Sequence, residues 1–342
     1  MMDNLSLWTG SGGLIIGFFF GLIMQRSRFC MVAAVSNMLL IRDYRYMQAF
    51  LAAWAIAIAG TTLLESTQLV AIGDSAYRGA RFDWFGAVAG GLLFGLGATL
   101  AGGCAVRTLI NAAEGQMGSL LVLLVMTVFC GITQYGPLEP VRVSLMERTV
   151  IQLQSGDNGL AALLNIAPWI IGLVAAISCL AFIRLSGSIK ENRALVFAGG
   201  SIGLLVVLAW LFTGWIVQDP FASSVPGAAT ITGPLARFSY YLGTGTGLTF
   251  SFGVAFVAGI LVGAVTGAVS TKTFHITGPD PSRIPHYIIG GIFMGVGATM
   301  AGGCNIGQGL SGVSTLSITS LLAAAGIFTG AVIGIKWWER HA

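Results

Sequence analysis

The chain has 342 residues, of which 55% are hydrophobic and only 9% are charged. A soluble domain carries roughly 25% charged residues, so this composition excludes a soluble enzyme, a disordered chain and a secreted disulfide scaffold. The formal net charge of +4 is thinly spread, and no basic cluster indicates a nucleic-acid partner. The solvent that suits so apolar a surface is the lipid bilayer.

Nine segments are apolar enough to cross a bilayer as helices of about 20 residues. In chain order they are 12–25, 47–64, 85–103, 117–134, 160–183, 194–217, 247–270, 287–303 and 316–335. Three shorter apolar pieces, 30–41, 105–113 and 305–313, are expected to be half-helices or re-entrant turns. The sequence therefore predicts an all-α integral membrane protein in which residues 1–342 form one transmembrane domain.

Polar stretches connect the helices at 65–84, 135–159 and 218–246, and the last contains three prolines and is expected to be an irregular loop. Because Lys and Arg favour cytoplasmic loops, the N-terminus is placed outside and the C-terminus inside. Eleven basic residues are then cytoplasmic: Arg26, Arg28, Arg42, Arg45, Arg184, Lys190, Arg193, Lys272, Arg283, Lys336 and Arg340. Five are external, namely Arg78, Arg81, Arg142, Arg148 and Arg237.

The most informative feature is an internal repeat. Residues 90–104 read GGLLFGLGATLAGGC and residues 290–304 read GGIFMGVGATMAGGC, with every difference an exchange of apolar residues. The two copies fall on the third and eighth crossings, which run in opposite directions. This is the pattern of an inverted-topology repeat, common in transporters whose site lies near the membrane midplane. The halves are predicted at 47–134 and 247–335.

Each copy ends in Gly-Gly-Cys. Glycines at GxxxG spacing, such as Gly91 and Gly95, have a purely structural interpretation, since they let helices approach closely. Two adjacent glycines weaken a helix by roughly 1 kcal/mol each relative to Ala, so they fit a position where the helix is meant to break. The short helix that follows would present its N-terminus, which favours anions.

Five cysteines divide into two groups. Cys130 and Cys179 lie inside continuous apolar runs and are expected to be small buried hydrophobes. Cys30, Cys104 and Cys304 stand at predicted junctions between a crossing and a short helix. A metal site would want more His or acidic neighbours than these positions have. The residues predicted to line the site are rich in donors and poor in acids, which suits an anion: Cys30, Cys104, Cys304, Gly102, Gly103, Gly302, Gly303, Asn305, Gln308 and Arg28.

A neutral thiol is a weak donor with a soft, polarizable surface. It has no advantage over a hydroxyl against chloride or phosphate. An anion that ends in sulfur gains a soft contact that water does not match. The cysteines therefore favour a sulfur-containing anion as the ligand.

Several motifs resemble the YeeE/YedE sulfur-transport family: GFFFGLIMQRSRFC at 17–30, the two AGGC elements, AEG at 113–115 and CNIGQG at 304–309. The resemblance extends over nearly the whole chain. It implies a multi-pass protein of the bacterial inner membrane, hourglass-like in shape, that imports thiosulfate. It also implies that Cys30, Cys104 and Cys304 lie along the transport path.

From these features we expect a transporter rather than an enzyme, with no cofactor and no metal. Arg78 and Arg81 are expected to concentrate the anion outside, and Gly-Gly backbone N–H groups to line a narrow neck. A small cytoplasmic sulfur-carrier protein is a candidate receiver. The alternatives are a membrane sulfurtransferase or thiol redox protein, a transporter of a selenium oxyanion, and an ion or metal channel.

Overall fold

The computed structural model describes residues 2–154, 156–187, 192–217, 225–244 and 251–341. Lys190, positions 218–224 of the predicted loop and positions 247–250 of the seventh predicted crossing lie outside the described residues. The described chain is helical apart from one antiparallel pair of short strands, β1 (Arg81–Phe82) and β2 (Ile151–Gln152).

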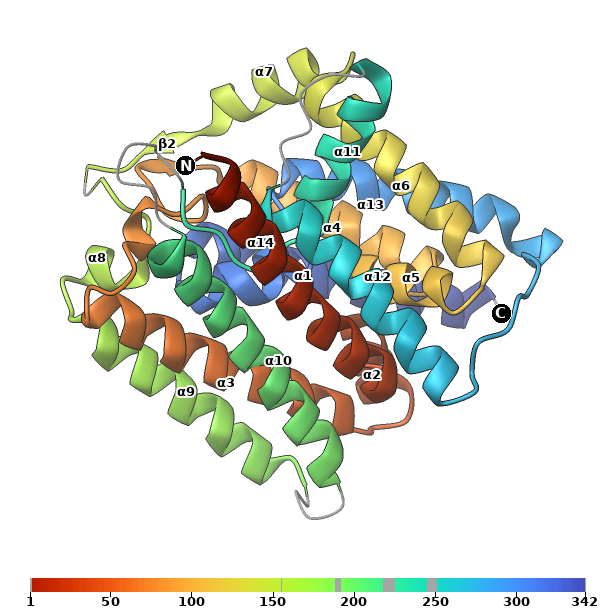
Figure 1. The fold of residues 1–342 in the computed structure, drawn as a ribbon, viewed down its shortest axis with the longest axis horizontal. Coiled ribbons are helices and arrows are strands. Elements are labelled where there is room, and N and C mark those ends of the chain that lie inside the picture. Colours follow the sequence, from red (N-terminus) through yellow and green to blue (C-terminus); the bar gives the residue numbers. More distant parts are fainter. Residues whose placement is uncertain (1, 155, 188–191, 218–224, 245–250, 342) are drawn as a thin grey trace.

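In the described residues, nine long helices make up the body of the molecule, and their arrangement can be followed in Figure 1. They are α1 (Met2–Ser27), α3 (Arg45–Ser66), α4 (Trp84–Leu100), α6 (Met117–Tyr135), α9 (Pro168–Leu185), α10 (Arg193–Leu211), α12 (Phe252–Ser270), α13 (Ile284–Met300) and α14 (Ile318–His341). Eight segments of the described chain are long and apolar enough to span a membrane, and one of them joins α4 to α5. Helix α13 has 17 residues, as α4 does, but it is not among the eight. The predicted all-α membrane fold is confirmed.

The three predicted half-helices are present as α2 (Met31–Leu40), α5 (Ala105–Ala113) and a π-helix, η5 (Gly307–Gly312). The remaining short elements are α7 (Glu139–Thr149), α8 (Leu160–Leu164), α11 (Thr232–Thr244), η1 (Ile72–Asp74), η3 (Phe212–Ile216) and η4 (Pro281–Arg283).

Two expectations about these connecting regions are wrong. The stretch expected to be an irregular loop forms helix α11 in its second half, because Pro234 sits in the first turn, where its missing N–H has no helical partner to lose. The single crossing expected at 160–183 is interrupted, since Asn165 adopts a left-handed backbone with φ of 53° and caps α8 before Pro168 starts α9.

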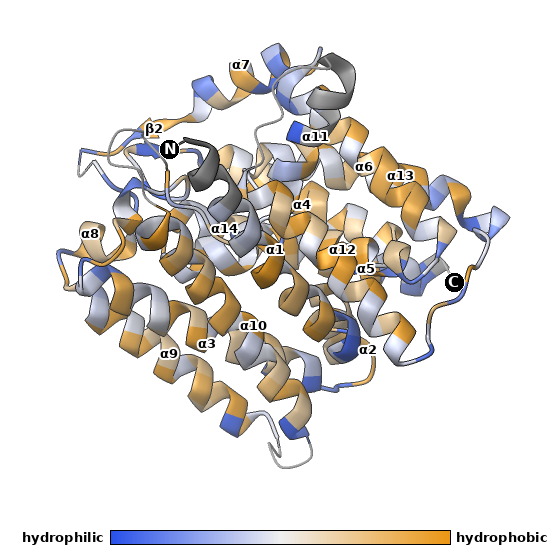
Figure 2. Cartoon of the chain, in the orientation of Figure 1, coloured by the Kyte–Doolittle hydropathy of each residue, from blue (hydrophilic) through white to orange (hydrophobic). Residues whose placement is uncertain are grey.

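Many large apolar residues are exposed, and apolar residues predominate along the helices at the periphery of the bundle (Figure 2). On α9, for example, Leu173, Val174 and Ile177 are each more than half exposed. Such a surface is stable against lipid rather than water. α1 begins at one end of the bundle and α14 finishes at the other (Figure 1), and we call these ends the N-face and the C-face.

Helices α4 and α13 cross in antiparallel contact through glycines. A Cβ atom added to Gly90 would lie 2.7 Å from the carbonyl oxygen of Gly297, and one added to Gly297 would lie 2.7 Å from that of Gly90. Gly97 and Gly290 face each other in the same way. The two backbones therefore touch at two reciprocal points, which only residues without a side chain allow.

The remaining glycines of the repeat pack against two further helices, α14 and α6. Gly91 and Gly95 of α4 contact the backbone of α14, at Ala323 and Ile327. Gly291 and Gly295 of α13 contact α6 instead. The structural interpretation of the GxxxG spacing is therefore correct, and the equivalent glycines of the two copies face equivalent helices.

Replacing Gly297 by alanine should destabilise the protein, although alanine favours a helix by about 1 kcal/mol over glycine. The added methyl group would force apart the backbones of α4 and α13, and overpacking of this kind costs roughly 1–3 kcal/mol. Thermal unfolding in detergent measures the change. Gly73→Ala is the control because a Cβ there meets nothing within 4 Å, and an equal loss in both variants would contradict the prediction.

Candidate functional site

Cys30 and Cys104 are the N-cap residues of the short helices α2 and α5, and Cys304 starts the turn that leads into η5. The carbonyl oxygen of Cys30 accepts from the Ala34 N–H at 3.0 Å, and that of Cys104 accepts from the Thr108 N–H at 2.8 Å. The carbonyl oxygen of Cys304 accepts from the Gln308 N–H at 2.7 Å. The predicted junctions between crossing and half-helix are therefore correct at all three positions.

The Gly-Gly pairs form the breaks that precede two of these cysteines. Gly102 and Gly302 have φ of 78° and 71°, the left-handed region in which glycine is favoured. The N–H of Gly103 donates to Ala98 of the preceding helix at 2.9 Å, and that of Gly303 donates equivalently at 2.8 Å. The N–H groups of Gly103 and Gly303 therefore complete helix caps and are not free to donate to an anion. That the Gly-Gly pairs line a neck stays a prediction.

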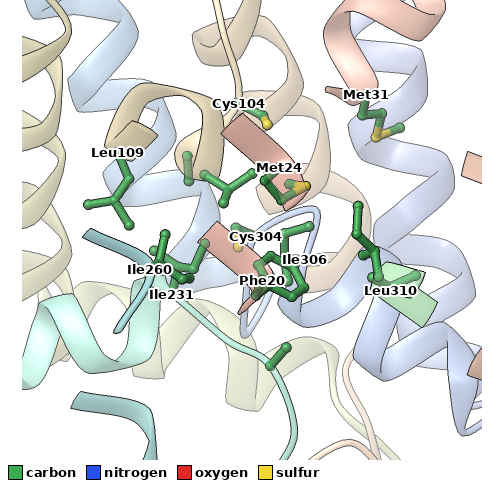
Figure 3. Packing of buried hydrophobic residues seen from close by; sticks show 14 of the residues in the cluster. Phe20, Met24, Met31, Cys104, Leu109, Ile231, Ile260, Cys304, Ile306 and Leu310 are labelled. Atoms are coloured by element: carbon green, nitrogen blue, oxygen red, sulfur yellow. The ribbon is translucent and has the colours of Figure 1, made fainter. Parts of the chain in front are cut away.

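Two of the thiols are in direct contact, with 3.7 Å between the Sγ atoms of Cys30 and Cys104. Cys304 belongs to the same buried cluster and lies within electrostatic range of Cys104. Figure 3 shows Cys104 and Cys304 together with Phe20 and Met24 of α1. The fold thus gathers three cysteines that are far apart in sequence into the centre of the bundle.

Cavities open toward this cluster from opposite faces. The N-face cavity has a volume of about 630 Å³, and its lining includes Tyr77, Thr230 and Arg237. The C-face cavity has a volume of about 400 Å³, and Arg28, Cys30, Gly102 and Arg107 line it together with Val32, Ala33, Ser36, Asn37 and Tyr46. Cys30 and Gly102 of the predicted site therefore face the C-face cavity.

The N-face cavity reaches the short segment that follows Cys304. A Cβ atom added to Gly307 would lie 3.0 Å from Thr230 Oγ1 and 3.6 Å from the Tyr77 hydroxyl oxygen. The floor of this cavity is therefore built next to the segment that follows the third thiol.

Asn305 and Gln308 were predicted as ligands, and the structure places them differently. Asn305 is only 1% exposed, and neither its amide nitrogen nor its amide oxygen has a hydrogen-bond partner in the described part of the chain. Gln308 donates to Ala301 O at 2.8 Å and accepts from Ser320 Oγ at 2.6 Å. Gln308 braces the Gly-Gly-Cys turn, whereas Asn305 is left unpaired beside Cys304.

The sequence places Arg107 in the donor-rich set around the cysteines, although the family motifs assign it no role, and it does not predict the lining of the N-face cavity. Arg107 follows Cys104 by three residues, so both lie on one side of the first turn of α5, a spacing that the sequence shows. Tyr77, Thr230 and Arg237 come from polar stretches whose path over the bundle no local pattern predicts. Cys130 is fully buried at the α6–α13 contact, where its thiol donates to Gly295 O, as expected of a packing residue.

Arg78, expected to attract anions from outside, is committed to an ion-pair cluster. Its side chain is 4% exposed and contacts Glu65 at 2.9 Å, and it also pairs with Asp157. Burial disfavours ionisation of Asp157. The hydrogen bond and charge of Arg78, together with the backbone N–H groups of Gly159 and Asn158, outweigh burial and hold the pKa of this carboxyl below its ordinary value. Arg78 therefore anchors the loop and is not available to a solute.

A bundle of spanning helices in which broken segments meet between two opposed cavities is the architecture of a membrane transporter. The sequence matches the sulphur transport family over residues 26–333. The chain belongs to this family, which is the YeeE/YedE family whose motifs it carries.

Two relatives cover most of the chain. A protein named thiosulfate transporter TsuA from Escherichia coli (strain K12) is 29% identical over 320 residues, 87% of this chain and 86% of the relative. A protein of the same name from Spirochaeta thermophila is 27% identical over 341 residues, 93% of this chain and 94% of the relative. The probable transporter YedE of Escherichia coli is 31% identical over 104 residues, 30% of this chain.

Arg78→Gln should lower the free energy of unfolding by about 3 kcal/mol, since it leaves two partly buried carboxylates without a cation. Thermal unfolding in detergent measures this loss, and Arg81→Gln, at an exposed position nearby, is the control. Ionised Asp157 contributes to the free energy of unfolding above a pH of about 4. This contribution is lost as the pH falls through the lowered folded-state pKa of Asp157. If the stability of wild type and of Arg78→Gln fell in the same way at acid pH, this assignment would be contradicted.

Proposed function

We propose that the protein takes up thiosulfate, or a closely related sulfur-containing anion, across the bacterial inner membrane. The names of the two relatives that cover most of the chain support thiosulfate as the substrate. The N-face is outside in this proposal, which puts the N-terminus in the periplasm and the C-terminus in the cytoplasm. The bias of Lys and Arg toward the C-face loops supports this orientation.

The observation that carries the proposal is the cluster of three thiols between the two cavities. An anion that leaves the N-face cavity would meet Cys304 first, then Cys104, and then Cys30 at the C-face cavity. A neutral thiol donates a weak hydrogen bond and presents a polarizable sulfur, so its contact with a terminal sulfur is favourable but shallow. Several weak binding sites in series suit conduction better than one strong binding site.

The unpaired amide of Asn305 supports the same path. A buried amide without partners costs about 1–3 kcal/mol for each unsatisfied group. That penalty disappears when a substrate supplies the partner. In our proposal the Asn305 amide N–H donates to the anion while it contacts Cys304, and Gln308 positions the turn.

The arrangement of the two halves supports the inverted repeat as the scaffold of this path. Segments 47–134 and 247–335 each contribute a glycine-lined helix, a Gly-Gly-Cys break and a short buried segment, and α4 and α13 run antiparallel. The breaks would then face opposite sides of the membrane within a single domain. In this proposal Cys304 would lie toward the N-face cavity, and Cys104 with Cys30 toward the C-face cavity.

In this proposal the protein transports its substrate without changing it. A small cytoplasmic sulfur-carrier protein would receive the anion at the C-face. The contact between Cys30 and Cys104 also suits a thiol redox pair, so intact-protein mass measured during turnover separates the two functions. A persulfide or disulfide that forms and decays at the uptake rate would favour the redox protein, and an unchanged mass would favour transport.

Cys104→Ser and Cys304→Ser should each reduce thiosulfate uptake by roughly tenfold or more, because serine keeps a hydrogen-bond donor but loses the soft sulfur contact. The measurement is uptake of radiolabelled thiosulfate into vesicles that contain only this protein, with sulfate, sulfite and selenite as competitors. Cys179→Ser on α9 is the matched control and should transport normally. Uptake at the wild-type rate in both site variants would refute the thiol path.

Asn305→Leu should separate stability from transport. It removes two unsatisfied buried polar groups and keeps the branching of the side chain, so the free energy of unfolding should stay the same or increase. Uptake should fall by about tenfold, since one hydrogen bond to the anion is lost. A variant that is less stable than wild type, or that transports as well, would show that the amide serves only the fold.

A further inference from the structure

The C-face cavity carries two guanidinium groups that the thiol path does not use. Arg28 lines it from the end of α1 and Arg107 lines it from the first turn of α5. We infer that this cavity is a binding site for a dianion with one soft end and one oxygen-rich end, held there before release. The inference rests on the proposed function and adds Arg107 as a determinant of substrate selectivity.

Arg107 lacks the partners that a cation inside a membrane protein normally has. Its Nη1 atom is buried and has no hydrogen-bond partner in the residues described. Its side chain lies over the Gly-Gly break, where a Cβ added to Gly103 would approach its Cγ to 3.2 Å. A buried guanidinium N–H without an acceptor is costly, and an anion in the cavity would supply that acceptor.

Arg28 reaches the cavity through an unusual backbone. Its φ is 50°, a left-handed conformation that is uncommon for a residue other than glycine. This turn joins α1 to Cys30, the cap of α2, so the guanidinium and the thiol enter the cavity from the same turn. Neither Arg28 nor Arg107 takes part in an ion pair within the described ranges.

The rest of the lining is free of negative charge. No Asp or Glu is among the described residues that border the cavity, while Ser36, Asn37 and Tyr46 add uncharged polar groups. Two cations without counterions in a partly enclosed space favour a ligand of charge −2. The charge count therefore matches a dianion better than chloride or another monoanion.

The position of the thiols gives the site two different ends. Cys30 lines the cavity and touches Cys104, and each lies close in sequence to one of the two arginines. The sulfur end of the anion would contact the thiols, and its oxygen end would accept hydrogen bonds from the guanidinium groups. Sulfate satisfies the arginines but not the thiols, so the site should prefer a sulfur-terminated dianion over sulfate.

Arg26 provides a matched control. It lies two residues from Arg28 at the same face, but its guanidinium donates to Ser270 Oγ at 3.4 Å and it does not line the C-face cavity. It lines a neighbouring cavity beside Leu195 and Phe197 of α10, which Arg28 also borders. Its replacement changes net charge by the same amount as replacement of Arg28. An effect of overall charge and an effect of the site can therefore be told apart.

The first test measures binding of thiosulfate and of sulfate to the purified protein by calorimetry. Arg28→Gln and Arg107→Gln should each weaken thiosulfate binding by about tenfold, as expected for a lost charge-assisted hydrogen bond, and Arg107→Lys should recover part of the affinity. Arg26→Gln should bind as wild type does. Equal losses in all three glutamine variants, or no loss in Arg107→Gln, would overturn the inference.

The second test does not depend on transport. Cys30 is modified by methanethiosulfonate reagents, which form a mixed disulfide with the thiol and release a sulfinate. A reagent with a sulfonate group should react faster than one with a trimethylammonium group, and Arg107→Gln should reduce that ratio by about tenfold whereas Arg26→Gln should not. An unchanged ratio in Arg107→Gln would refute the site.

The site and the proposed function can fail separately. If wild type binds thiosulfate and shows this ratio but transports no thiosulfate, the proposed function fails and the site stands.

Discussion

The close approach of α4 and α13 is the constraint on which the site depends. At their crossing the backbones touch through Gly90, Gly97, Gly290 and Gly297, which leaves no room for side chains. Because the helices are antiparallel, their Gly-Gly breaks point to opposite faces of the bundle. The short segments that follow are therefore directed into the interior from two sides, and their first residues are the cysteines.

Irregular backbone inside a membrane requires hydrogen-bond partners. The segment after Cys304 obtains such partners from several parts of the bundle. Trp54 donates to the Gly309 carbonyl oxygen at 2.5 Å, and Trp210 donates to Ser314 Oγ at 3.2 Å. Ser311 donates to the Ala229 carbonyl oxygen at 2.7 Å. This network explains why a π-helix is tolerated in the centre of the bundle, and why Asn305 is conspicuous in lacking any partner within the described part of the chain.

The sequence revealed those features that are encoded locally. Adjacent glycines predicted the helix breaks, and repetition of the Gly-Gly-Cys motif singled out Cys104 and Cys304, because each signal resides in a few neighbouring residues. The role of Arg78 was missed because its partner Asp157 is 79 positions away and only the folded loop brings them together. The cap geometry of Gly103 was missed for a different reason: a break was predicted, but which carbonyl its N–H would find depends on how the chain turns.

The similar stretches 90–104 and 290–304 are followed by short segments of different form. The first is a regular α-helix, α5, that begins with Ala105, whereas the second is a π-helix, η5, that follows Asn305 and Ile306. Along the proposed path a solute would meet an amide after one Gly-Gly-Cys break and, after the other, the methyl group of an alanine. Two breaks of nearly identical sequence would therefore offer it chemically different contacts.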